Sequence, residues 1–323
     1  MAVLDVQARL AARRTRRMAA RGLVRALLWA SGGPAMSSRI AWGPLRGVRL
    51  VMPTDDHPAL ALGTYERHVV RVLRQYTRRG MTVYDIGANV GYLTLVFSSL
   101  VGPSGHVAAF EPDPRTRRLL QQNICNNGAK NVRLYPYVVS DRNGIVNFAT
   151  FEYSLVNHIA TERTPADATV LSVQATSLDE LVYGCNLLAP SVIKVDVEGA
   201  EERVLRGSSR ILQRIKPVVI VETRSESYDS IKAMADMHGY SVAVLSKADM
   251  ELPGQVADVL LVPACRRLAW LTNELVHRCA TDVAQPQEWR ANLQRNEARE
   301  SRRAARGVLH RQRSAAVKAQ SVI

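Results

Sequence analysis

A short apolar stretch, 82–86, ends abruptly in the small residues Gly87-Ala88-Asn89, and this pattern limits strongly how the chain can fold. A parallel strand covered on both faces has this pattern, because it is apolar throughout and a tight turn follows it. We expect the next helix to begin near Val90, where free backbone N–H groups face a ligand. A second apolar stretch, 106–110, ends in Glu111, about twenty residues beyond the turn, where an acid is well placed to bind two ribose hydroxyls.

The glycines of this turn, Gly87 and Gly91, have the spacing Gly-x-x-x-Gly. A dinucleotide-binding turn has Gly-x-Gly-x-x-Gly instead, with a glycine that lets a pyrophosphate approach. With Asp85 at the end of the strand, the pattern favours S-adenosylmethionine (SAM), which carries ribose, adenine and an amino acid but no phosphate. We expect the glycines to let the ligand approach the backbone. From these residues alone, a turn glycine, a helix-packing glycine and a surface glutamate remain an alternative.

The net charge of +14 is concentrated at the two ends of the chain. Residues 1–50 carry +9 and residues 286–323 carry +6, which leaves residues 51–285 with −1. The expected folded core is therefore nearly neutral, and the charge does not by itself indicate nucleic-acid binding. The basic ends are compatible with an anionic membrane surface, an acidic partner, nucleic acid or plain solvated arms.

Cysteine usage and hydropathy favour a cytoplasmic protein. The four cysteines are far apart and form no C-x-x-C pair, which is typical of free thiols in a reducing compartment. They are Cys125, Cys185, Cys265 and Cys279. No apolar run is long enough to span a bilayer. The Arg- and Ala-rich stretch 9–29 is compatible with an interfacial helix at the inner face of a membrane, a transit-like peptide or a simple extension.

We expect three parts: a basic extension, 1–38, that is helical or disordered; a domain, 39–263, that starts with a small β lead-in; and a helical Arg-rich extension, 264–323. Strands are expected at 82–86, 106–110, 132–138, 145–150, 169–175, 191–197, 217–222, 240–246 and 256–262, and helices at 66–76, 90–101, 114–127, 199–213 and 226–238. This alternation predicts an α/β fold whose mostly parallel sheet is covered by helices on both faces.

Three local signals refine this arrangement. Asn143-Gly144 is typical of a hairpin turn and predicts that strands 132–138 and 145–150 pair across it. Ser177 is expected to cap the helix that follows strand 169–175. Residues 151–169 are polar and irregular, so no element is predicted there.

Charged residues alternate with apolar ones in the stretch Ile193 to Glu201, where a doubly covered strand should be apolar throughout. Lys194, Asp196 and Glu198 are therefore expected on one face, at the carboxyl end of a central strand, where open α/β sheets bind their ligands. A purely structural interpretation uses the same groups. In it Lys194 pairs with Asp196, Glu198 caps the next helix, and Glu201 interacts with that helix's dipole.

These carboxylates suit transfer of a methyl group to a hydroxyl, because an alcohol is a weak nucleophile unless its proton is accepted as the bond forms. Asp196 is the first candidate for that base, and Glu222, which ends the next strand, is a second carboxylate on the same edge. His158 is an alternative base or a surface residue. Carboxylates on one edge are also compatible with a divalent metal, but no metal is expected.

Two further polar sites have open interpretations. Asp141 follows the third strand, where it could accept the adenine amino group or form an Asx turn. Thr64 is expected to cap the first helix of the domain, with Glu66 in its first turn.

Together these motifs resemble the FkbM-type family of SAM-dependent methyltransferases, in family order over about residues 63–223. The matching residues are Gly63-Thr64-Tyr65-Glu66, Asp85-Ile86-Gly87-Ala88-Asn89-Val90-Gly91, Phe110-Glu111-Pro112, Asn123, Ser140-Asp141, Ser177-Leu178-Asp179, Ile193-Lys194-Val195-Asp196-Val197-Glu198-Gly199-Ala200-Glu201 and Glu222. The block that starts at Ile193 is specific, whereas many methyltransferases share the glycine turn. Residues 1–50 and 264–323 have no counterpart, and 151–169 is a candidate substrate lid.

The resemblance implies a class I, Rossmann-like methyltransferase fold, with a mostly parallel seven-stranded sheet and a reversed final hairpin. It implies O-methylation of a hydroxyl on a sugar, glycolipid or polyketide-type metabolite. The residues expected to bind SAM are Glu66, Asp85, Gly87, Asn89, Gly91, Glu111 and Asp141. Those expected at the transfer site are Lys194, Asp196, Glu198 and Glu222.

Two other function classes remain open. The basic ends would suit a nucleic-acid methyltransferase. However, Asp196-Val197-Glu198-Gly199 lacks the Asp/Asn-Pro-Pro-aromatic motif of base amino methylation, and few aromatic residues are present for stacking. Nucleic acid is therefore not the expected partner. The second alternative is a non-catalytic cofactor-binding protein whose ends contact a membrane or a partner. The sequence predicts no oligomeric state.

Overall fold

A computed structural model describes residues 35–53, 58–151, 158–160, 164, 168–245 and 254–264. Almost all of the two basic extensions, together with Cys265, Cys279 and most of the proposed lid, lie outside the described residues. Their predicted helices and membrane contacts therefore stay predictions. Within the described part of the chain, no helix has the length and hydrophobicity that crossing a bilayer requires.

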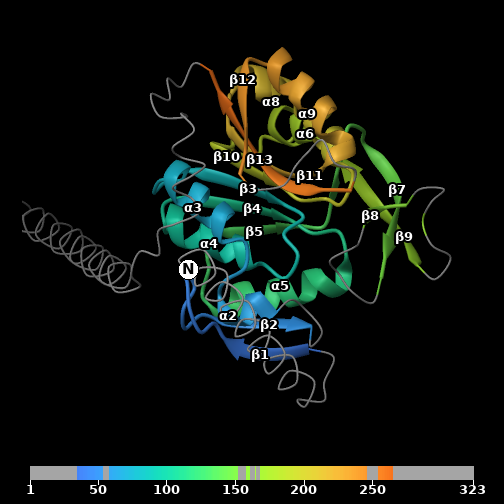
Figure 1. The fold of residues 1–323 in the computed structure, drawn as a ribbon. Coiled ribbons are helices and arrows are strands. Elements are labelled where there is room, and N and C mark those ends of the chain that lie inside the picture. Colours follow the sequence, from blue (N-terminus) through green and yellow to red (C-terminus); the bar gives the residue numbers. More distant parts are fainter. Residues whose placement is uncertain are drawn as a thin grey trace, which may run out of the picture. The chain divides into compact units, whose positions relative to one another are not determined.

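A seven-stranded sheet forms the centre of the fold (Figure 1). Its order is β12 (Tyr240–Val244), β13 (Val256–Pro263), β11 (Val218–Arg224), β10 (Val192–Val195), β3 (Thr82–Ile86), β4 (His106–Phe110) and β5 (Val132–Tyr135). Neighbours from β11 to β5 are parallel, whereas β13 is antiparallel to both β11 and β12. The predicted Rossmann-like sheet with a reversed final hairpin is confirmed.

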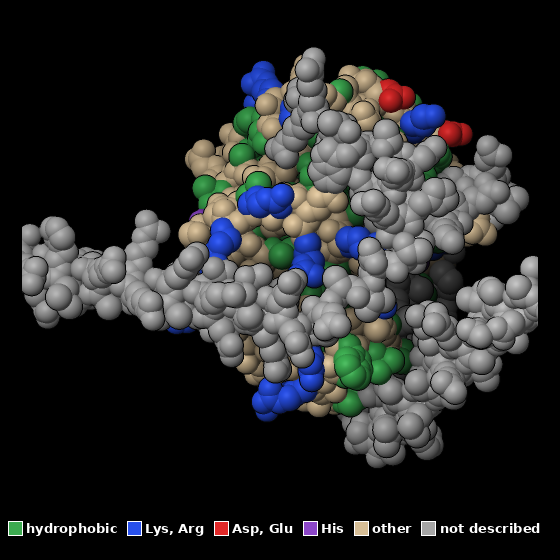
Figure 2. Space-filling model, turned by 60° about the vertical axis from the view of Figure 1, so that its left-hand side comes forward, with side chains coloured by type: hydrophobic (Ala, Val, Ile, Leu, Met, Phe, Trp, Pro, Cys, Tyr) green, Lys and Arg blue, Asp and Glu red, His purple; other side chains and the backbone are tan. Residues whose placement is uncertain are grey.

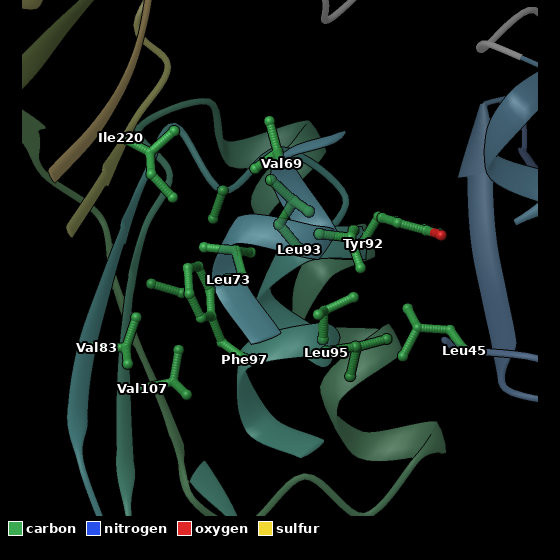
Figure 3. Packing of buried hydrophobic residues seen from close by; sticks show 14 of the residues in the cluster. Leu45, Val69, Leu73, Val83, Tyr92, Leu93, Leu95, Phe97, Val107 and Ile220 are labelled. Carbon is green, nitrogen blue, oxygen red and sulfur yellow. The ribbon is translucent and has the colours of Figure 1, made fainter. Parts of the chain in front are cut away.

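Helices cover both faces of this sheet because its strands bury side chains on both sides. On one face the sheet packs against α3 (Arg67–Tyr76), α4 (Tyr92–Val101) and α5 (Pro114–Asn126). Figure 3 shows this packing, with Val83, Val107 and Ile220 of the sheet near Leu73 and Phe97 of the helices. The opposite face packs against α6 (Leu178–Tyr183), α7 (Glu201–Arg206), α8 (Ser209–Arg214) and α9 (Ser225–Met237).

The predicted β lead-in is an antiparallel pair, β1 (Ala35–Arg39) and β2 (Arg49–Pro53), followed by the short helix α2 (Pro58–Leu62). Its first strand begins four residues before the predicted boundary at residue 39. Asn123 of α5 attaches this β lead-in to the domain. The Asn123 side chain accepts from Val51 N at 2.6 Å and donates to Val51 O and Val90 O, each at 2.8 Å. The amide is fully buried and uses both of its polar atoms.

The predicted hairpin at Asn143-Gly144 is wrong. The chain leaves the main sheet after β5 and enters a four-stranded sheet of order β6 (Val138–Val139), β9 (Thr169–Thr176), β7 (Gly144–Thr150) and β8 (His158–Ile159). Strand β9 lies between β6 and β7 and pairs with both. The Asn143 side chain accepts from Ser177 N at 3.2 Å, which joins this turn to the end of β9.

The helix predicted at 199–213 is divided into α7 and α8 at Gly207. A Cβ atom there would lie 2.1 Å from the Ser140 carbonyl oxygen, so the chain passes too close for a side chain. Asp179 accepts from the backbone N–H groups of Arg210 and Ile211 at 2.8 and 3.0 Å and so supports the start of α8. Ser177 accepts from Glu180 N and caps α6, as predicted.

The nearly neutral charge of the core conceals a separation of charges. Basic side chains are spread over the face shown in Figure 2, where acidic ones are few. Exposed basic side chains include Arg67 and Arg74 of helix α3 and Arg78, which follows the helix. Several acids, in contrast, lie inside the fold, at the carboxyl ends of the central strands.

Candidate active site

The glycine turn after β3 is held by contacts within the protein. Gly87 and Gly91 have φ of 79° and 92°, in the left-handed region that glycine favours. A Cβ atom on Gly87 would lie 1.7 Å from the Asp196 carbonyl oxygen, and one on Gly91 would lie 2.3 Å from a Leu120 methyl carbon. Both glycines line the cavity, but the protein itself already excludes a side chain at these positions. The expectation that they let a ligand approach the backbone stays a prediction, and the close protein contacts are a second reason for glycine at both positions.

Replacing Gly87 by alanine is expected to lower the free energy of unfolding by about 3 kcal/mol or more, because it adds a steric clash with backbone to an unfavourable φ. Gly128→Ala is the matched control, since Gly128 also has positive φ (60°) but a Cβ atom there would meet nothing within 4 Å. Urea unfolding of both variants measures the difference. Equal losses would show that the close approach to Asp196 is unimportant.

Glu111 follows the end of β4 and lines the cavity, with only 6% of its surface exposed. One carboxylate oxygen accepts from Asn89 N and the other from Asp113 N, both at 2.9 Å. Burial raises the pKa of Glu111 to about 7, although these two N–H donors oppose the rise. Asp113 in turn caps α5 through Arg115 N, so the strand end and the helix start are fixed together.

Asp85, at the carboxyl end of β3, is fully enclosed. Thr94 of α4 donates to its Oδ2 at 2.5 Å. Burial raises the pKa of Asp85 to about 6, and the Thr94 hydrogen bond limits the rise. Asn89, in the left-handed conformation at φ 48°, uses its side-chain oxygen to accept from Val90 N at 2.7 Å.

A cavity of about 280 Å³ joins the turn to the charged strand end. It is lined by every predicted site residue except Asp141, namely Glu66, Asp85, Gly87, Asn89, Gly91, Glu111, Lys194, Asp196, Glu198 and Glu222. Apolar side chains form another part of its wall, among them Phe110, Val138, Val139, Phe148 and Ile159. The sequence motifs thus converge on one space.

Two other candidates lie apart from this cavity wall. Asp141 faces the guanidinium of Arg142 at 3.6 Å and accepts from the Ser140 hydroxyl at 3.2 Å, and it is not among the lining residues. Its role in binding adenine stays a prediction without support from this geometry. His158 also lies off the wall, with its ring stacked on Phe151 at 5.6 Å between centroids.

The floor of the cavity is defined here as Lys194 together with Glu66, Asp196 and Glu222, which all line it. Lys194 lies opposite Asp85 of β3 in the strand register, and Glu222 lies opposite Asp258 of β13. The fully buried Lys194 Nζ lies 3.3 Å from Asp196, 3.8 Å from Asp258 and 3.9 Å from Glu222. The predicted Lys194–Asp196 ion pair and the predicted position of Glu222 on the same edge are confirmed.

Glu66 reaches the floor from the start of α3. It occupies the N-cap position with φ 40° and makes no side-chain capping bond, so the prediction that Thr64 caps this helix is wrong. Oε2 of Glu66 is buried and has no hydrogen bond among the described residues. Burial raises the pKa of Glu66 to about 7, and the nearby Lys194 ammonium opposes the rise.

Glu198 pairs with Arg224 and not with Lys194, although sequence alternation predicted that Glu198 and Lys194 share a face. The strand ends at Val195, and Glu198 turns into the left-handed region, at φ 49°, and pairs with Arg224 at 3.2 Å. It does not cap the following helix, whose N-cap is Ala200. Glu201 instead accepts from Gly199 N at 2.7 Å, which is more specific than the predicted dipole interaction.

The acids of the floor outnumber its cations, and this imbalance favours bound protons. Burial and the neighbouring Asp196 raise the pKa of Glu222 to about 9. Carboxylate oxygens of Glu66, Asp196 and Glu222 lie within 4.8 Å of one another. A divalent cation among them would lie beside the Lys194 ammonium, and repulsion between these like charges disfavours it. The floor is therefore suited to donating and accepting hydrogen bonds.

Sequence analysis missed two members of this network, His68 and Asp258. His68 Nε2 lies 2.6 Å from Asp258 Oδ2. Asp258 is an acid inside the otherwise apolar stretch Val256–Pro263, and a buried charge needs a partner, so the sequence could have indicated a polar contact there. Its partner could not be identified without the register between β11 and β13.

Comparison with known proteins agrees with this geometry. Residues 85–242 match the family model described as the methyltransferase FkbM domain. This segment is similar to the members of that family. The resemblance drawn from the motifs is therefore confirmed for the segment that holds the glycine turn, Glu111 and the charged strand end.

Two curated proteins similar to this chain are methyltransferases. The hexuronic acid methyltransferase AglP of Haloferax volcanii is 30% identical over 155 residues, which are 48% of this chain and 61% of AglP. The 2-O-methyltransferase NoeI of Sinorhizobium fredii is 26% identical over 172 residues, which are 48% of this chain and 70% of NoeI. The match thus spans less than two thirds of AglP. A solved FkbM methyltransferase structure from Methylobacillus flagellatus is 15% identical, covers 63% of this chain and 53% of its own, and has a TM-score of 0.40.

Proposed function

We propose that the protein is a SAM-dependent O-methyltransferase that acts on a hydroxyl of a sugar in a glycan or glycolipid. The observation that carries this proposal is the single cavity that joins Glu111 and the glycine turn to Lys194, Asp196 and Glu222. Similarity to the FkbM-type family supports methyl transfer, the hexuronic acid methyltransferase AglP supports a sugar acceptor, and the 2-O-methyltransferase NoeI supports transfer to oxygen.

The residues that line the cavity suit the ribose and the adenine of SAM. Each oxygen of Glu111 accepts one backbone N–H, so lone pairs remain for two ribose hydroxyls. Apolar side chains such as Phe110 and Val139 offer a wall for adenine, and no amide cluster is needed because SAM has no phosphate. When bound, SAM supplies an electrophilic methyl group on a sulfonium.

Asp196 and Lys194 would perform complementary tasks on the acceptor. As the acceptor oxygen bonds to the methyl carbon and the bond from sulfur to that carbon breaks, Asp196 takes the hydroxyl proton. Lys194 Nζ has no hydrogen bond among the described residues although it is fully buried and lines the cavity, which leaves its N–H donors for the acceptor oxygen. The ion pair with Asp196 leaves the hydrogen-bonding capacity of this buried ammonium unused, so an acceptor oxygen there would be bound favourably.

The direct test uses the full chain, SAM with a labelled methyl group, and a glycan and glycolipid extract of the source organism. Label is expected in a sugar methyl ether, identified by mass spectrometry after hydrolysis. Label in nucleic acid, or in a polyketide-type product instead of a sugar, would overturn the proposed acceptor. Absence of SAM binding by the folded chain would overturn the cofactor as well.

Glu111→Gln is expected to weaken SAM binding about tenfold or more, because the amide accepts at only one atom and cannot match two ribose hydroxyls. Isothermal titration with SAM at pH 8, above the pKa of Glu111 near 7, measures the loss. Glu180→Gln is the control, since Glu180 lies in α6 and does not line the cavity. Unchanged affinity in Glu111→Gln would remove Glu111 from the ribose site.

A further inference from the structure

Two ionisable side chains meet behind the floor of the cavity, and neither lines it. His68 Nε2, near the start of α3, lies 2.6 Å from Asp258 Oδ2, on β13. Asp258 is buried, whereas the His68 side chain is 36% exposed. Both residues lie outside 85–242, the segment that matches the family model, so that match assigns them no role.

The other oxygen of Asp258 connects this pair to Lys194. Asp258 Oδ1 lies 3.8 Å from Lys194 Nζ and has no hydrogen bond among the described residues. Asp258 therefore shares the ammonium with Asp196, which lies 3.3 Å from it. Because Lys194 is fully buried, water screens these interactions only weakly, and a change in one of them is felt by the others.

We propose that His68 and Asp258 form a positioning pair that acts through Lys194 and sets the pH at which the floor becomes negatively charged. This inference rests on the proposed function, because it requires the sulfonium of SAM to lie beside the floor. Asp258 keeps the ammonium from pairing with Asp196 alone, so Asp196 remains able to take a proton. His68 limits the negative charge that Asp258 adds.

Removing the two partners should have opposite effects. The charged groups that face Lys194 come from four strand ends and one helix: Asp85 of β3, Asp196 after β10, Glu222 of β11, Asp258 of β13, and Glu66 and His68 at the start of α3. Loss of the Asp258 charge lowers the pKa values of Glu66 and Glu222, which Asp258 raises. The hydrogen bond to Asp258 raises the pKa of His68 and so favours its cationic form. A cation there stabilises the neighbouring carboxylates, so loss of His68 should raise the pKa values of Glu66 and Glu222.

The test compares binding of SAM and S-adenosylhomocysteine to the full chain by calorimetry from about pH 5 to about pH 10.5, a range that extends beyond the pKa of Glu222 near 9. The two ligands differ in the positive charge on sulfur, so the ratio of their Kd values reports the charge of the floor. This ratio should favour SAM increasingly as the pH rises. We expect its midpoint to move down by about one pH unit in Asp258→Asn and up by about one unit in His68→Gln.

Glu202→Gln is the matched control, since it removes the acid of a peripheral ion pair with Arg206 and should leave the midpoint unchanged. Shifts in the same direction, or no shift in either variant, would overturn the positioning pair. If Asp258→Asn does not fold, His68→Gln decides alone. The His68 ring is partly exposed, so its replacement should be tolerated. An unchanged or lowered midpoint in His68→Gln would contradict the proposal. Failure of the wild-type chain to bind either ligand would instead reject the proposed function.

Discussion

Asp196→Asn is expected to lower the rate of methyl transfer about 10²- to 10⁴-fold, the usual contribution of a general base. The amide keeps the size of the carboxylate but cannot accept the hydroxyl proton. Contacts to the ribose through Glu111 are untouched, so the Kd for SAM should change little. Single-turnover transfer from labelled SAM to the sugar acceptor, together with calorimetry, separates the two effects.

Glu198→Gln is the control for this prediction. Glu198 is also a half-buried acid on the cavity wall, but it pairs with Arg224 and not with Lys194. Glu198→Gln should lower the rate of methyl transfer far less than Asp196→Asn does. Equal turnover by Asp196→Asn and the wild type would exclude Asp196 as the base, and Glu222 would then be the next carboxylate to replace.

Lys194→Met is expected to destabilise the fold by about 3–5 kcal/mol at pH 8.5, because it leaves buried acids without their cation. The loss should be smaller at pH 5.5. Lys194 lowers the pKa values of Glu66 and Glu222, which nevertheless stay above 4.5 in the folded protein, at about 7 and about 9. Without Lys194 they rise further, so the folded variant binds more protons than the unfolded chain and loses stability as the pH increases.

Urea unfolding at the two pH values measures this dependence. Lys232→Met, on the exposed side of α9, removes the same charge from solvent and should change stability little at either pH. A loss for Lys194→Met that is the same at pH 5.5 and 8.5 would contradict the charge argument. It would indicate a packing defect instead.

The sequence predicted those parts of the site that depend on local order. The strand at 82–86, its glycine turn and the acid at 111 form one continuous unit, and periodicity identifies such a unit directly. The pairing of Lys194 with Asp196 was also local, because Asp196 directly follows the strand and its N–H still bonds Ile86 O of β3, so the alternation reaches it. The prediction that Glu198 shares a face with Lys194 was wrong because the strand ends three residues before Glu198, so the alternation does not reach it.

Long-range register explains what the sequence could not predict. Asp258 reaches Lys194 only because β13 runs antiparallel beside β11, and His68 reaches Asp258 across 190 residues of chain. The hairpin at Asn143-Gly144 failed because a turn motif does not say which strand will lie between its neighbours. In the structure β9, which comes later in the chain, takes that place.

The position of β13 between β11 and β12 also bears on the order of folding. Strand β12 is made before β13 but can join the sheet only through it, so the edge of the sheet closes last. Until then Glu222 and Lys194 lack Asp258, and a chain still emerging from the ribosome cannot complete the charge network behind the floor. Contacts of such large sequence separation form slowly. We therefore expect the cofactor half of the cavity to become ordered before the half that accepts the proton.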